Sequence, residues 1–240
     1  SDLIIAHHPT FIIDPETILT TSNNRRTLYY AKRDGFILHT SKQLSVGEEL
    51  DIENADFKST GNIHASLDKN IKINMSTKDT GSDQVGQNLV VETDELNVGG
   101  SVANGAKIIA NKVVIGGQTH KTAKIFAKDV EVNIHRGYIE GAKVHITRLE
   151  HGEVVGDEVH VTQMIGGTVR ARKIVVDVVG SHATLIASHE IIISSELRGN
   201  DNQFIIEPAV SLADREKLEL LKDEFIELED ELGSDISIVF

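Results

Sequence analysis

The chain contains no cysteine and no tryptophan, and aromatic residues make up only 4% of its 240 residues. The lack of cysteine excludes a disulfide scaffold and a thiolate metal site, and it is typical of cytoplasmic proteins. The sequence also has no signal-peptide pattern and no apolar run long enough to span a membrane. These absences predict a cytoplasmic protein without a transmembrane segment.

Basic residues are scarce as well. The 24 lysines and arginines face 37 aspartates and glutamates, which gives a formal net charge of −13. Nucleic-acid-binding proteins display basic surfaces that replace counterions on the phosphate backbone. The composition therefore argues against a nucleic-acid partner and leaves proteins, including a second copy of the chain, as the expected partners.

Short segments with apolar residues at alternate positions recur through the middle of the chain, as at 71–75, 130–134, 144–146 and 159–161. Lys, Glu, Asn or His stands between the apolar residues, which is the period of a strand with one buried face. Units this short cannot bury their own apolar faces, so neighbouring units must stack to form a core. This pattern predicts a parallel β-helix and therefore an all-β protein.

A recurring Ala-Lys followed by a β-branched residue marks the repeat at Ala106, Ala123 and Ala142, with related starts at Asp157 and Ala171. The gaps between these starts are 17, 19, 15 and 14 residues. Left-handed β-helices of the acyltransferase type need a strict six-residue rhythm, whereas right-handed crossovers are the general preference of parallel strands. Residues 58–210 are thus expected to form a right-handed parallel β-helix of roughly nine coils, a rod of roughly 40 Å.

The two ends of the chain lack the repeat. Residues 1–57 contain short apolar runs separated by turn residues, which predicts a small β-rich N-terminal cap over one open end of the β-helix. Residues 211–232 are expected to form an acidic amphipathic helix that begins near Ser211 and ends before Gly233. Residues 233–240 would follow it as a C-terminal tail.

The expected helix carries an apolar seam at spacings of 3, 4, 3 and 4 residues, which is a heptad pattern of about two repeats. Two interpretations remain open for it: a coiled-coil strand that pairs with another helix, or a helix that folds back to cover an apolar strip of the rod. Its residues are the candidate protein-interaction residues of the chain: Leu218, Leu221, Phe225, Leu228 and Leu232.

Two quoted segments resemble the flagellar assembly protein A family. The stretch TLYYAKRDGFILHTSKQLSVGEELDIENADFKSTGNIHA is similar to the family's entry into its β-helix, and IGGTVRARKIVVDVVGS is similar to its closing segment. The order of a β-helix followed by a coiled coil also agrees, over roughly residues 25–232. A shorter first region and a shorter coiled coil are departures. The resemblance implies a cytoplasmic, non-enzymatic bacterial protein that takes part in flagellar assembly or placement.

A second segment, GSVANGAKIIANKVVIGGQTHKTAKIFA, resembles the C-terminal β-helix of the septum-site inhibitor of bacterial cell division. Bactofilin-type rods, which form polymers, are a third relative in architecture. The alternatives to a flagellar role are therefore a regulator of the division site and a polymer-forming scaffold. All three resemblances imply a structural or protein-interaction role.

A polysaccharide-acting enzyme is the remaining class to weigh. Such β-helices line a groove with paired carboxylates and sugar-stacking aromatics. The aromatic residues of the expected rod are Phe57, Phe126, Tyr138 and Phe204, which stand far apart in the sequence. We therefore predict no catalytic residues, no cofactor and no metal.

Four histidines raise the question of a metal site, and we predict none at either pair. His7 and His8 follow an apolar run without carboxylate partners in a matching context, which is typical of solvated side chains. His145 and His160 both stand in Val-His-Ile/Val segments 15 residues apart, so they stack at about 4.8 Å if the gap is one coil. We expect a surface ladder there, and zinc should leave the melting temperature unchanged.

Overall fold

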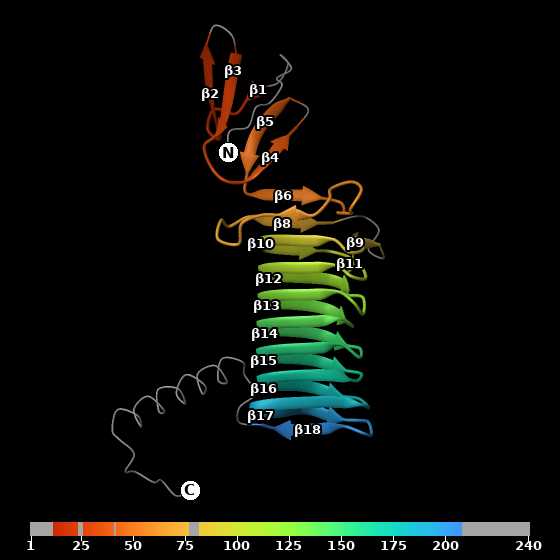
Figure 1. The fold of residues 1–240 in the computed structure, drawn as a ribbon. Coiled ribbons are helices and arrows are strands. Elements are labelled where there is room, and N and C mark those ends of the chain that lie inside the picture. Colours follow the sequence, from red (N-terminus) through yellow and green to blue (C-terminus); the bar gives the residue numbers. More distant parts are fainter. Residues whose placement is uncertain (1–11, 24–25, 41, 77–81, 208–240) are drawn as a thin grey trace, which may run out of the picture.

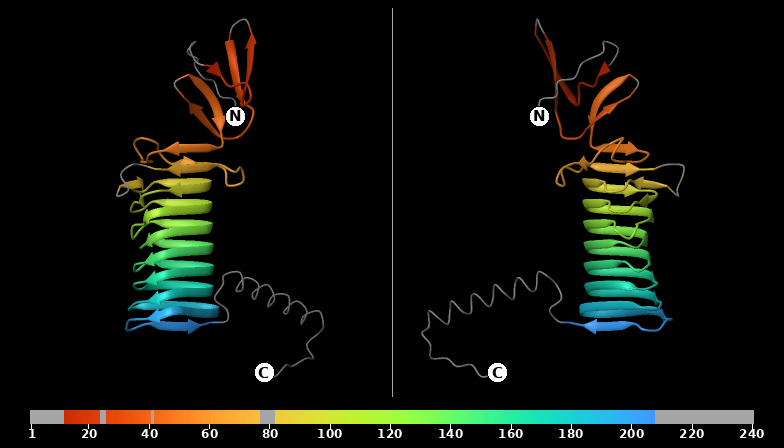
Figure 2. Two further views of the ribbon diagram at one scale, coloured as in Figure 1. Left: turned by 180° about the vertical axis from the view of Figure 1, so that it is seen from behind. Right: turned by 45° about the vertical axis from the view of Figure 1, so that its right-hand side comes forward.

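The structure is a computed structural model of the chain, and it describes residues 12–23, 26–40, 42–76 and 82–207. Within these residues all regular secondary structure is β-strand. Figures 1 and 2 show a straight rod of stacked strands with a small group of strands at its N-terminal end. The all-β class and the parallel solenoid are confirmed. The segment 211–232 and the tail 233–240 lie outside the described residues.

The N-terminal group consists of two antiparallel hairpins. One pairs β2 with β3, the other pairs β4 with β5, and β1 adds to β5 in parallel. A small core of Ile18, Tyr29, Leu44 and Val46 holds the group together. The strands are β1 (Ile12–Ile13), β2 (Ile18–Asn23), β3 (Arg26–Ala31), β4 (Phe36–His39) and β5 (Gln43–Gly47).

The solenoid is a single sheet of eleven strands, all paired in parallel. It begins at β6, which lies on the N-terminal side of the boundary at residue 57 expected from the sequence. Its strands are β6 (Glu49–Ile52), β7 (Ile63–His64), β8 (Lys72–Met75), β10 (Val90–Val98), β12 (Lys107–Gln118), β13 (Lys124–His135), β14 (Tyr138–Leu149), β15 (Glu153–Met164), β16 (Gly167–Val179), β17 (Ala183–Leu197) and β18 (Gln203–Ile206). A separate pair, β9 (Asp83–Val85) and β11 (Ser101–Val102), lies beside it.

The solenoid has about seven turns, fewer than the roughly nine expected from the sequence. Residues 53–76 and 82–89 account for the difference, because within these described residues the strands are only the short β7, β8 and β9. The right-handed winding stays a prediction that rests on the general preference of parallel crossovers.

The Ala-Lys marker does not occupy one position of the coil. Lys107 pairs with Lys124, so Ala106 and Ala123 precede equivalent residues. Lys143, however, pairs with Asp129, five residues further along β13. Ala142 therefore precedes a different part of the coil, and the gap of 19 residues is not a coil length. The same Ala-Lys pattern therefore occurs at two different bends of the coil.

Long strands such as β14 consist of three straight stretches, because the pairing register skips one residue at two places. In β14 the stretches are 138–141, 143–146 and 148–149. Equivalent stretches of successive coils stack into three walls, which we call the first, second and third wall in chain order. Along each stretch, side chains alternate between the core and the solvent.

The core is a set of aliphatic ladders that run along the rod. Val130, Val144, Val159 and Ile174 share one inward position of the second wall and are at most 4% exposed. The largest fully buried side chains are Ile, Leu and Met, and none is aromatic. A narrow interior filled from three sides has room for branched aliphatic chains, which agrees with the low aromatic content.

One histidine breaks the aliphatic pattern. His135 occupies an inward position of the third wall beside Leu149 and is completely buried. Its Nδ1 lies 2.6 Å from the hydroxyl of Thr119, which also accepts a hydrogen bond from the backbone N–H of Arg136. The Nε2 atom has no hydrogen-bond partner among the described residues. Burial lowers the pKa of His135 to about 4, although the backbone near Gly137 and Glu153 partly opposes this effect.

Candidate protein-interaction surface

A groove of about 650 Å³ lies where the first wall bends into the second. Strands β12 to β16 contribute to it, so it runs across several coils. Phe126 and Tyr138 line one part of it, and Arg170 and Arg172 line another. Aromatic residues and arginine are enriched in the centres of protein interfaces. We call this feature the aromatic groove.

The aromatic rings of the groove lie together. The centroids of Phe126 and Tyr138 are 5.8 Å apart, and the ammonium group of Lys107 lies 5.4 Å from the centre of the Phe126 ring. These aromatics were expected to be scattered, and for this pair that expectation is wrong. Lys124 pairs with Tyr138, and Phe126 pairs with Glu140, so the two rings are diagonal neighbours on adjacent coils.

The hydroxyl of Tyr138 donates a hydrogen bond of 3.0 Å to the carboxylate of Glu140. Partial burial raises the pKa of Tyr138 to about 12, and the hydrogen bond and the negative charges of Glu140 and Glu153 act in the same direction. The phenol thus stays neutral at physiological pH. It presents an apolar ring with a polar tip, a combination suited to a partner surface.

Glycine occupies two stacked positions in the lining of the groove, Gly141 and Gly156. A Cβ atom on Gly141 would lie 2.6 Å from the carbonyl oxygen of Ala127, and one on Gly156 would lie 2.6 Å from that of Gly141. Real Cβ atoms do not approach a backbone oxygen this closely, so β14 and β15 keep their spacing at these two positions only because both residues are glycine. Each Cβ would also meet buried valine side chains of the core at 3.0–3.6 Å, so the two glycines allow close packing on the core side of this bend.

The second wall carries a row of charges of alternating sign. Residues paired at one outward position form the charge ladder: Glu49, Lys72, Glu95, Lys112, Asp129, Lys143, Glu158, Lys173 and Glu190. Lys173 binds Glu190 at 2.6 Å, and Lys72 lies 3.6 Å from Glu95. Each charge has opposite charges as its neighbours, so the ladder is largely neutralised within the wall.

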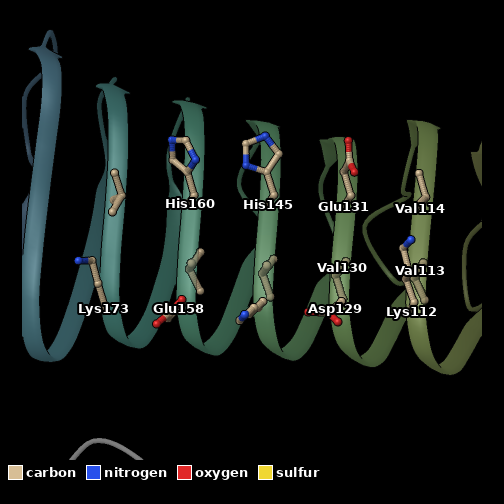
Figure 3. A pocket seen from close by; sticks show the side chains of 14 residues that line it. Lys112, Val113, Val114, Asp129, Val130, Glu131, His145, Glu158, His160 and Lys173 are labelled. Atoms are coloured by element: carbon tan, nitrogen blue, oxygen red, sulfur yellow. The ribbon is translucent and has the colours of Figure 1, made fainter.

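Two residues beyond the charge ladder, the second wall carries histidine on two neighbouring strands, β14 and β15. His145 and His160 are register partners whose ring centroids are 4.8 Å apart, which confirms the predicted stacking. Figure 3 shows the two histidines beside residues of the charge ladder. Both histidines and residues of the charge ladder line a groove of about 420 Å³. His160 Nε2 lies 3.2 Å from the carboxylate of Asp177, which also accepts a hydrogen bond from Ser194. The hydrogen bonds from Ser194 and His160 lower the pKa of Asp177.

Among the described residues, no group of three or more His, Asp or Glu side chains is arranged to hold a metal ion. His160, Asp177 and Ser194 form a surface hydrogen-bond network on the second wall, and His145 stacks on the His160 ring. The seam predicted from the sequence lies outside the described residues and is not part of this network; its residues are Leu218, Leu221, Phe225, Leu228 and Leu232. His7 and His8 also lie outside the described residues.

The fold and these surfaces define a parallel β-solenoid whose walls carry a groove with aromatic and arginine side chains. Comparison with protein-family models, with curated proteins and with solved structures finds no match to this chain. Within the part of the chain that the structure describes, no helix is long and apolar enough to cross a membrane.

Proposed function

We propose that this chain is a non-enzymatic, protein-binding rod of the bacterial cytoplasm that takes part in flagellar assembly or placement. The resemblance of residues 27–65 and 165–181 to the flagellar assembly protein A family supports the cellular role. The observation that carries the binding role is the aromatic groove, which brings Phe126, Tyr138 and Arg170 together in one surface depression.

The composition of the groove favours a protein partner. Tyr138 and Phe126 offer apolar area with few rotatable bonds, and the two arginines offer donors at the opposite part of the groove. The groove lies on a rigid sheet, so binding would order few groups of the rod itself. A partner that inserts one apolar side chain next to a carboxylate matches this arrangement.

A crosslinking experiment in the source bacterium tests the binding role. A photoreactive phenylalanine analogue at position 138 is expected to crosslink one defined cytoplasmic protein. The matched control is the same analogue at Gln163, which is exposed on the third wall. Equal crosslinking patterns from both positions would rule out the groove as the binding surface.

A motility experiment tests the cellular role. Deletion of the gene is expected to change the number or position of flagella, and the wild-type chain should restore them. Tyr138→Ala and Arg170→Ala variants should fail to restore them at equal protein level, whereas Gln163→Ala should succeed. Normal flagella in the deletion strain would contradict the proposed role and would leave the crosslinking result to identify another process.

A polymer-forming scaffold is the second candidate, and one observation favours it. The last coil ends in exposed apolar side chains, among them Leu197, Phe204 and Ile206. Rods that join at this end would form dimers or longer assemblies. Reversible, concentration-dependent filaments in light scattering and electron microscopy would establish the scaffold instead.

A further inference from the structure

The C-terminal end of the solenoid leaves the last members of the inward ladders uncovered. Leu185 is fully buried, whereas Phe204, its partner on the next strand, is 42% exposed. Val179 is fully buried, whereas its partner Leu197 is 52% exposed. We call the uncovered surface the C-terminal floor; its residues are Ile191, Ile193, Leu197, Phe204 and Ile206.

The opposite end of the core is closed. Phe36 of β4 packs against the main core cluster from the N-terminal group, as do Ile52 and Ile63 from the first coils. An ion pair of 3.2 Å between Lys69 and Asp34 also joins the N-terminal group to the rod. Among the described residues, the C-terminal floor has no corresponding cover. Leu197, Phe204 and Ile206 are each more than 40% exposed on this one end surface, and Ile191 and Ile193 beside them are only partly buried, which is an unusual exposure for an isolated protein.

The sequence after the solenoid contains a segment with an apolar seam that matches the apolar C-terminal floor. The described chain leaves the solenoid at Glu207, directly after β18, and residues 208–240 continue from that end. The seam from Leu218 to Leu232 would extend about 21 Å as a helix. One four-residue stretch of the coil extends about 13 Å. A seam of this length is sufficient to cross the floor of a coil made of three such stretches.

We propose that residues 211–232 cap the C-terminal floor of the same chain through the seam Leu218, Leu221, Phe225, Leu228 and Leu232. The short connection through residues 208–210 gives the segment an effective concentration in the millimolar range at the floor, which a second copy reaches only at high protein concentration. The cap closes the end at which rods would otherwise join and leaves the walls as binding surfaces.

Charge determines how the cap responds to salt. The last coil, residues 183–207, contains four acids and one arginine, and the segment 211–232 contains nine acids and three bases. Both partners are therefore acidic, so their mutual repulsion opposes a contact that apolar side chains drive. Added salt screens this repulsion. The cap is expected to bind more tightly as the salt concentration rises.

The absence of native cysteine allows a direct test in the full-length chain. A single cysteine at Leu197→Cys reports on the floor, and Ser195→Cys, at an exposed position two residues away, is the control. The rate of maleimide labelling is measured for each. In the capped chain the cysteine at 197 should react at least tenfold more slowly than the cysteine at 195, and the ratio should increase with salt.

Changes in the seam provide the matched comparison. Leu221→Asn with Leu228→Asn should raise the labelling rate at position 197 to that of the control. Asp223→Asn with Asp230→Asn, on the opposite face of the expected helix, should leave it low. Circular dichroism checks that the β-solenoid is retained, and light scattering gives the mass of each protein.

Three results would overturn the proposal: equal labelling rates at 197 and 195 in the unchanged chain, slow labelling that the seam substitutions do not alter, and protection that appears only when the mass doubles. The last result would assign the floor to a second copy and would support the scaffold function. None of these outcomes depends on the flagellar role.

Discussion

The buried histidine of the third wall should make the protein sensitive to mild acid. His135 is completely buried, its Nε2 has no partner among the described residues, and its pKa is lowered from 6.5 to about 4. In the unfolded chain the same imidazole binds a proton near pH 6.5. The unfolded state therefore binds more protons than the folded state between these two values, and the stability decreases as the pH falls through this window.

The magnitude follows from the two pKa values. The full effect below pH 4 is about 3 kcal/mol, because each pH unit of difference corresponds to about 1.4 kcal/mol. Between pH 7 and pH 5 the expected loss in the free energy of unfolding is about 2 kcal/mol. Above pH 7 the contribution is constant because the imidazole is neutral in both states.

A His135→Leu variant should lose this dependence. The substitution removes the buried Nε2 atom that has no partner among the described residues and places a side chain like that of its neighbour Leu149, so the stability at pH 7 should change by less than about 1 kcal/mol. The assay is denaturant unfolding at pH 7, 6 and 5. His151→Asn is the control, because His151 is exposed and its positive φ of 57° suits asparagine. Parallel stability curves for the wild type and His135→Leu between pH 7 and pH 5 would refute the reasoning.

Two further substitutions test the walls. Lys143→Glu would place a carboxylate between Asp129 and Glu158 on the charge ladder, and it should lower the stability by about 1 kcal/mol at low salt and by less at high salt. Lys143→Gln should cost less, and thermal unfolding at two salt concentrations distinguishes them; an equal loss for both would contradict a charge effect. Gly156→Ala would bring a Cβ to 2.6 Å from the carbonyl oxygen of Gly141, and it should cost about 1–3 kcal/mol in thermal unfolding. An unchanged melting temperature would show that the coils move apart at this bend without cost.

The fold class was predictable because alternating apolar residues in short units leave few ways to build a core. The stacked pair His145 and His160 was predictable for the same reason, since both stand in nearly identical tripeptides one coil apart. The coil count and the phase of the repeat were not, because Ala-Lys occurs at two different bends, as Ala123 and Ala142 demonstrate.

The aromatic groove was missed because its residues meet only through the register. Phe126 and Tyr138 are twelve residues apart in a chain whose paired residues lie 14 to 23 residues apart along the second wall. Their contact is diagonal, so it depends on the exact length of one coil. The close stacking of β14 and β15 has a sequence signal in Gly141 and Gly156, which are one coil apart, but glycines also mark turns and the signal is not specific.

The charge ladder explains how coils with nearly identical core residues stack in the correct order. Val130, Val144, Val159 and Ile174 are nearly interchangeable inward residues, so the core alone would accept a stack in which one coil is skipped. Skipping any single coil of the ladder would bring two residues of like charge together at about 4.8 Å, the spacing of neighbouring strands. Directly opposed like charges destabilise a sheet. Skipping two coils would restore the alternation of charge. The charge ladder therefore disfavours the smallest stacking error, the omission of one coil, which the aliphatic core alone would accept.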